Sequence, residues 1–114
     1  MGGHRGDNMP KYLFTGSYTA EGGRGVLGEG GSGRRAAVDK LAASLGGKVE
    51  SFHFAFGSDD YFIIVDLPGN AAAASLGLTV SASGAVSNRT VVLMTPEEID
   101  AATKLSPTYR APGR

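Results

Sequence analysis

The feature that most constrains the fold is an apolar run at residues 61–67, "YFIIVDL". Nearly continuous apolar residues in a short run predict a strand that is covered on both faces. The segment "KVESFHFAF" at 48–56 precedes this run, and the turn sequence "GSDD" joins the two. Two strand patterns joined by such a turn predict a β-hairpin.

The segments on either side of the hairpin alternate between strand and helix patterns. Strands are predicted at 11–18 ("KYLFTGSY") and 85–94 ("AVSNRTVVLM"). The segment "RRAAVDKLAASLGG" has apolar residues near helical spacing and ends at the pair Gly46-Gly47, which favours a helix stop. A second helix is predicted after Pro68, with Asn70 as its N-cap and Gly84 as its end.

A third helix is predicted from the segment "TPEEIDAATKL". Thr95 as N-cap, Pro96 at the first helical position and Glu98 three residues after the cap form a capping box. The complete order is β-α-β-β-α-β with an added C-terminal helix. This order predicts the α+β, ferredoxin-like class with an antiparallel four-stranded sheet.

The length of 114 residues suits one domain, which we expect at residues 9–105 between a flexible leader (1–8) and a flexible tail (106–114). Eleven basic residues balance eleven acidic ones, so the chain lacks the charge typical of nucleic-acid or anionic-membrane binders. The absence of cysteine excludes disulfides and cysteine-based zinc sites. No apolar run is long enough to span a membrane, and the first residues lack the apolar h-region of a secretory signal. We therefore expect a cytoplasmic location.

Two helices on one face of a four-stranded sheet would leave the other face bare. Phe52, Phe54 and Phe56 share one side of their strand, and three such side chains on an open face would form an exposed apolar patch. We therefore expect a homodimer in which two sheet faces pair. The alternative is a monomer in which the strand at 61–67 is central and the C-terminal helix covers the second face.

Four segments, "PKYLFTGSYTAEG", "EGGSGRRAAVDKLAASLGGKVESFHFAFG", "IIVDLP" and "SASGAV...LMTPEEIDAA", together resemble the GYD domain family of small bacterial proteins over about residues 9–103. The resemblance implies a dimeric α+β barrel of ferredoxin-like subunits, without a defined function. The Gly-Tyr-Asp signature is altered: Gly57 and Asp60 match, Asp59 stands at the tyrosine position, and Tyr61 follows the acid. If the tyrosine of the family signature serves a functional site, this chain has either lost that role or transferred it to Tyr61.

The glycine-rich segment contains two matches to G-x-G-x-x-G, at residues 23–28 and 28–33. So many glycines produce such matches by chance, and the chain is too short for a doubly wound sheet, so no nucleotide or other cofactor is predicted. The glycines would instead allow a helix to approach the sheet or form a mobile lip over a cleft. Arg34 and Arg35 follow directly, and they either hold a small carboxylate or phosphate or remain solvated.

His53 is the one histidine of the predicted domain, and with no cysteine or second histidine beside it no metal site is predicted. Its imidazole would suit acid–base catalysis, with a hydrogen-bonded sheet histidine as the alternative. The resemblance to dimeric α+β barrels implies a ligand cleft between the sheet and the helices, and we expect His53 there together with Tyr18, Arg34 and Arg89.

The acidic residues of the hairpin divide into two kinds. Asp59 and Asp60 lie in a turn, where carboxylates usually cap the backbone, although Asp60 is also a candidate ligand-binding residue together with Tyr61. Asp66 is the only charge in its strand, so it needs a partner, and Arg89 and Lys11 are the natural candidates.

Three functions remain open from the sequence. The first is a homodimer that binds a small anionic or aromatic organic molecule in a cleft between sheet and helices. The second is a cofactor-independent monooxygenase, isomerase or decarboxylase with His53 and Tyr18 as catalytic residues. The third is a structural or protein-interaction module. A fold of this kind does not by itself choose among them.

Overall fold

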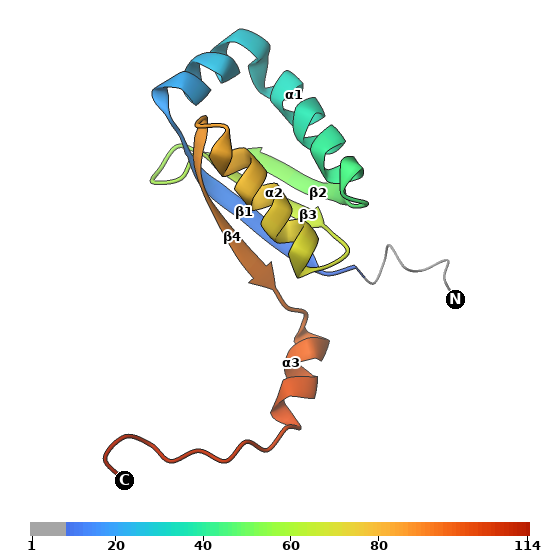
Figure 1. Cartoon of the computed structure of the whole chain (residues 1–114), viewed down its shortest axis with the longest axis vertical. Helices are drawn as coiled ribbons and strands as arrows, with labels where there is room; N and C mark the ends of the chain where they lie inside the picture. Colours follow the sequence, from blue (N-terminus) through green and yellow to red (C-terminus); the bar gives the residue numbers. More distant parts are fainter. Residues whose placement is uncertain (1–8) are drawn as a thin grey trace.

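A computed structural model describes residues 9–114; the predicted leader, with His4, lies outside these residues. The strands and helices follow the predicted order, which confirms the α+β ferredoxin-like fold (Figure 1). They are β1 (Lys11–Tyr18), α1 (Ala20–Ser44), β2 (Lys48–Phe54), β3 (Tyr61–Asp66), α2 (Asn70–Ala82), β4 (Val86–Leu93) and α3 (Pro96–Thr103).

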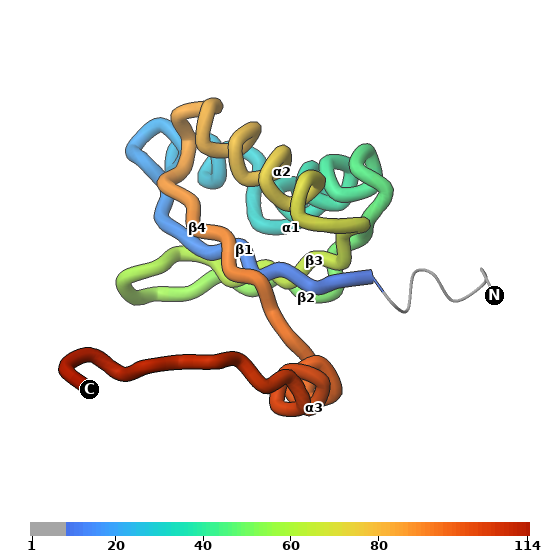
Figure 2. The backbone as a smooth tube through the Cα atoms, turned by 60° about the horizontal axis from the view of Figure 1, so that its bottom comes forward, coloured from blue at the N-terminus to red at the C-terminus, as the bar shows by residue number. Residues whose placement is uncertain are grey.

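The strands form one antiparallel sheet in the order β2-β3-β1-β4. Both α1 and α2 lie over one face of this sheet, and α3 lies on the opposite side of it (Figure 2). β1 and β3 occupy the two central positions, so β3 is central as in the monomer alternative, but α3 does not pack on the second face. We refer to the face covered by α1 and α2 as the inner face, and to the other as the open face.

The hydrophobic core lies between the inner face and the two helices. Its buried members come from the sheet and from both helices, and they include Tyr12, Phe14, Val65, Leu67, Ala42 and Leu76. Full burial of one large apolar side chain contributes about 1.5–3 kcal/mol, so these contacts hold the helices against the sheet.

The glycine-rich segment is helical and forms the first half of α1, where a loop or a mobile lip was one expectation. Thr19 caps this helix by accepting a hydrogen bond from the backbone N–H of Gly22, at 3.2 Å. A Cβ atom at Gly22 would lie 2.0 Å from the carbonyl oxygen of Ala85, so only glycine permits this close approach. The helix kinks at Gly30, where φ is 78°. Both G-x-G-x-x-G matches thus lie inside α1 and do not form the strand-to-helix turn of a dinucleotide site.

The ends of the helices follow the predicted signals with one exception. Gly46, with φ of 82°, and Gly47 donate their backbone N–H groups to Ala43 and Ala42, which is the Schellman arrangement. The capping box of α3 is also present. At α2, however, the N-cap is Gly69, and the expectation for Asn70 is wrong: its Oδ1 instead accepts a hydrogen bond from the hydroxyl of Tyr12, at 2.7 Å.

A β-bulge in β2 changes the side to which its residues point. The register between β2 and β3 shifts between Val49 and Ser51, so Val49 and Phe52 both pack on the core. Phe54 is likewise on the inner face, where its ring would contact a side chain at Gly31 of α1. The expected patch of three phenylalanines on the open face is therefore absent.

The open face nevertheless has an apolar region formed by other residues, with the charged Lys11 and Arg89 on the same face. The pairing of Leu13 with Ile64 and Val91 places these three side chains in one row across the sheet. Phe62 and Leu93 lie on the same face in the adjacent rows.

Asp66, which is only 4% exposed, forms an ion pair with Lys11 at 2.7 Å. This is the structural pairing that the sequence predicts for the single charge of β3. Lys11 also contacts Glu50, and the hydrogen bond to Asp66 is the main reason that the pKa of Lys11 is raised.

Candidate functional site

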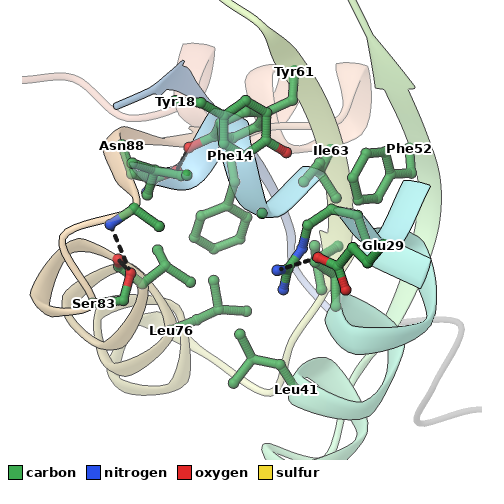
Figure 3. Close-up of a pocket in the computed structure, with 18 of the residues that line it drawn as sticks. Phe14, Tyr18, Glu29, Leu41, Phe52, Tyr61, Ile63, Leu76, Ser83 and Asn88 are labelled. Carbon is green, nitrogen blue, oxygen red and sulfur yellow. Dashed lines mark hydrogen bonds and ion pairs between the residues drawn. The ribbon is translucent and has the colours of Figure 1, made fainter. Parts of the chain in front are cut away.

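A cavity of about 260 Å³ lies between the inner face of the sheet and the helices α1 and α2 (Figure 3). Its position follows from the fold, because the kink in α1 leaves the two helices splayed above the strands (Figure 1). The side chains that line the cavity come from β1, β2, β3 and β4 below and from both helices above.

Most of the cavity wall is apolar. Phe14, Phe52 and Ile63 project into it from the sheet, and Leu41 and Leu76 close it from the helices (Figure 3). These strand positions share the inner face because alternate residues of a strand point the same way. The wall therefore suits a ligand whose surface is mainly hydrocarbon or aromatic.

Two tyrosines form the polar end of the cavity. The rings of Tyr18 and Tyr61 pack with centroids 5.4 Å apart, and the hydroxyl of Tyr61 donates a hydrogen bond of 2.6 Å to Oδ1 of Asn88. The hydroxyl of Tyr18 has no hydrogen-bond partner among residues 9–114. It is consequently the group left to bind a ligand atom.

Burial keeps both tyrosines protonated at neutral pH. Desolvation raises the pKa of Tyr61 to about 12, with smaller contributions from Tyr18, Asp59 and Asp60. Desolvation also raises the pKa of Tyr18, and the positive charge of Arg34 lowers it in part. Both side chains are therefore neutral hydrogen-bonding groups.

An ion pair on α1 borders the cavity next to this polar end. The guanidinium of Arg34 lies 3.0 Å from a carboxylate oxygen of Glu29, and both side chains are partly exposed. Glu21 also lines the cavity. The charge of Arg34 is thus paired with Glu29 within α1, and Glu21 adds a second carboxylate to the cavity lining.

Three of the six predicted site residues line this cavity: Tyr18, Arg34 and Tyr61. His53 does not, because β2 turns it to the open face, where it pairs with Phe62 and is exposed. It is thus on the opposite side of the sheet from Tyr18, so the two expected catalytic residues do not share a site.

Arg89 and Asp60 also lie outside the cavity, and each has a structural partner. Arg89 is on the open face of β4, where it forms a 2.6 Å ion pair with Asp59 of the hairpin turn. Oδ2 of Asp60 accepts a hydrogen bond of 2.9 Å from the backbone N–H of Tyr18. The two turn carboxylates therefore attach the β2–β3 hairpin to the neighbouring strands and help to position Tyr18.

Within residues 9–114, no cluster of three or more histidine, aspartate or glutamate side chains could hold a metal ion. Four polar residues of the cavity were not anticipated from the sequence: Glu21, Glu29, Ser83 and Asn88. Strand alternation in "AVSNRT" would place Asn88 on the inner face with Val86, so its signal was present. Glu29 had no such signal, because the glycine-rich segment around it lacks the apolar periodicity that would assign its residues to a face.

The family model described as GYD domain matches residues 12–103. The chain belongs to the GYD domain family. The family match extends from β1 to the end of α3 and so includes the entire cavity. In this GYD domain the altered signature is the β2–β3 turn, and Tyr61, which follows it, begins β3 and enters the cavity.

A search of curated proteins and a search of solved structures each found no match to this GYD domain. No helix within residues 9–114 has the length and hydrophobicity needed to cross a membrane.

Proposed function

We propose that this GYD domain is a homodimeric module that binds a small organic molecule in the cavity between its sheet and helices. The observation that carries the proposal is the hydroxyl of Tyr18, which lies at the polar end of an otherwise apolar cavity without a partner among residues 9–114. Within residues 9–114 no buried side-chain polar atom lacks a partner, so this hydroxyl is one that solvent reaches, and it is available to a ligand oxygen or nitrogen.

The cavity favours a small ligand with an aromatic or aliphatic body. Its volume of about 260 Å³ is below the roughly 300–1,000 Å³ typical of sites for drug-sized molecules. The rings of Phe14 and Phe52 would contact such a body on two sides.

The electrostatics favour a neutral ligand over an anionic one. Arg34, the cation expected to hold an anion, is already paired with Glu29, and Glu21 adds a negative charge near the same opening. An anion held by Arg34 would have to compete with Glu29, in a cavity whose lining also includes the carboxylate of Glu21. We therefore propose a ligand with a single neutral hydroxyl or carbonyl group beside Tyr18.

The chemistry of the tyrosines supports binding without a proton transfer. Because burial raises the pKa of both hydroxyls, neither is a base at neutral pH. They are suited to donate or accept a hydrogen bond and so to orient the ligand.

The open face supports the homodimer. Leu13, Phe62, Ile64, Val91 and Leu93 form an apolar surface on a single side of the sheet. Contiguous apolar surfaces of this kind are seldom left exposed on monomers, and two copies related by a two-fold axis would cover both faces at once.

Isothermal titration calorimetry with two probes tests the ligand class. 1-Naphthol has an aromatic body with a neutral hydroxyl, and 1-naphthoate has the same rings with a carboxylate. We expect 1-naphthol to bind more tightly than 1-naphthoate, and Tyr18→Phe to weaken 1-naphthol binding about 3- to 10-fold, the equivalent of one neutral hydrogen bond.

Tyr12→Phe is the matched control, because it removes the same hydroxyl from a tyrosine that does not line the cavity. This control should bind 1-naphthol as the unmodified protein does. The proposal fails if 1-naphthol does not bind, if Tyr18→Phe binds it unchanged, or if the anionic probe binds more tightly.

A further inference from the structure

The C-terminal arm, defined here as residues 94–114, is separate from the packed domain. After β4 the chain leaves the sheet, and α3 has no buried residue (Figure 1). The radius of gyration of the Cα atoms is 17.2 Å, whereas a compact chain of this length has about 13 Å. The arm is thus a projecting segment with almost no contact with its own domain.

A helix like α3 needs a packing surface to be stable. It has eight residues, and isolated helices shorter than about 12–15 residues are marginal in water. Its capping box contributes only about 1 kcal/mol. The sequence therefore defines the start of the helix well, but the helix lacks the tertiary contacts that stabilise most helices.

The arm presents apolar side chains that have no partner surface in this chain. Ile99 of α3 is 47% exposed, Leu105 is 71% exposed and Tyr109 is 76% exposed. An apolar surface is needed to cover them. The open face of the sheet is such a surface, and on it Phe62 is 41% exposed.

The position of the arm indicates where its partner lies. Figure 2 shows α3 and the tail on the open side of the sheet, extending beneath the sheet while remaining clear of it. A partner's sheet placed against the open face would therefore meet the arm. The apolar arm and the apolar face belong to the same side of the same chain, so a two-fold axis brings each arm to the other copy.

We propose that residues 94–114 form an exchanged arm, in which α3 and the tail of one protomer pack on the second copy of the chain and hold the two open faces together. This inference rests on the homodimer of the proposed function and adds the segment that stabilises it. Such an exchange accounts for a short capped helix that has no buried residue within its own protomer.

The chain has no tryptophan, so Ile99→Trp introduces a single reporter into α3. Its fluorescence is recorded over a concentration series, with the mass determined in parallel by sedimentation equilibrium. We expect the emission maximum to move to shorter wavelength as the dimer forms. Emission that is independent of dimer formation would overturn the exchange, and emission already blue-shifted in the monomer would show that the arm packs on its own sheet.

A pair of full-length variants tests the energetic contribution of the arm. Ile99→Glu places a carboxylate on the apolar side of α3, and Ala101→Glu places the same group about 200° around the helix as the control. We expect Ile99→Glu to raise the dimer dissociation constant at least 10-fold and Ala101→Glu to change it less than 3-fold.

The possible failures are distinguishable. If the unmodified protein and Ile99→Glu are dimers with equal dissociation constants, the arm does not contribute, and the homodimer stands without it. If the unmodified protein stays monomeric over the whole series, the exchanged arm and the homodimer are both wrong. Binding of 1-naphthol is measured separately and does not depend on either result.

Discussion

Replacing Tyr61 with phenylalanine should change how the stability of the domain depends on pH. Tyr61 is 4% exposed, and burial raises the pKa of its hydroxyl from 10.0 to about 12. In the unfolded chain this hydroxyl is exposed to water and titrates near its ordinary value. Above that value the unfolded chain has lost the proton and the folded protein has kept it, so the free energy of unfolding decreases as the pH rises.

The size of the effect follows from the two pKa values. The contribution of Tyr61 to stability is fully present below the unfolded pKa and is lost progressively as the pH rises toward the folded pKa. Proton linkage with these values gives a loss of about 1.4 kcal/mol between pH 8 and pH 11. At pH 8 the variant also lacks the hydrogen bond to Asn88, which costs it about 1 kcal/mol.

Urea unfolding followed by circular dichroism at pH 8 and pH 11 measures both quantities. Tyr61→Phe should be less stable than the unmodified protein at pH 8, and the difference should shrink or reverse at pH 11. A difference that stays constant or widens between the two pH values would refute the assignment of a buried, protonated Tyr61.

Two further substitutions test the packing that positions the site. Lys11→Met leaves the carboxylate of Asp66 buried without its partner, and it should lower the free energy of unfolding by about 1–3 kcal/mol in urea titrations at neutral pH; no change would mean that water solvates Asp66. Gly22→Ala forces a Cβ against the carbonyl of Ala85 and should clearly lower the thermal midpoint of unfolding. At Gly23 no atom lies within 4 Å of an added Cβ, so Gly23→Ala should be neutral or stabilising by up to about 1 kcal/mol. Equal effects of the two substitutions would contradict the close approach of α1 to Ala85.

The sequence predicts the order of the elements because each has a strong local signal. The apolar run of β3 indicates a central strand, the pair Gly46-Gly47 supplies the positive φ and the hydrogen bonds that end α1, and Thr95 with Glu98 begins α3. These signals depend on neighbouring residues, so they can be recognised without a structure.

The first half of α1 is not predictable in this way, because its local preferences oppose a helix. Each glycine costs about 1 kcal/mol relative to alanine within a helix. The segment is helical because of tertiary contacts, above all the approach of Gly22 to Ala85 and the cap that Thr19 provides. Glu29 and the opening of the cavity depend on that helix.

The candidate site was predicted in part for a related reason. Alternation along a strand tells which residues share a face, but not which face the helices cover. Tyr18 was placed correctly in the cavity, whereas His53 was expected there and lies on the open face. Alternation alone does not reveal the extra residue of the bulge after Val49. Because of that residue, positions before and after the bulge that alternation would assign to opposite faces lie on the same face.

Titration of ¹⁵N-labelled protein with 1-naphthol, followed by two-dimensional NMR, tests the central claim most directly. The claim is that the cavity between the inner face and the helices is the binding site. It predicts that the amide signals of Tyr18, Ile63 and Leu76 shift together and saturate with a single dissociation constant. Shifts confined to the open face, around Leu13 and Val91, would contradict the claim and assign the apolar ligand to the other side of the sheet.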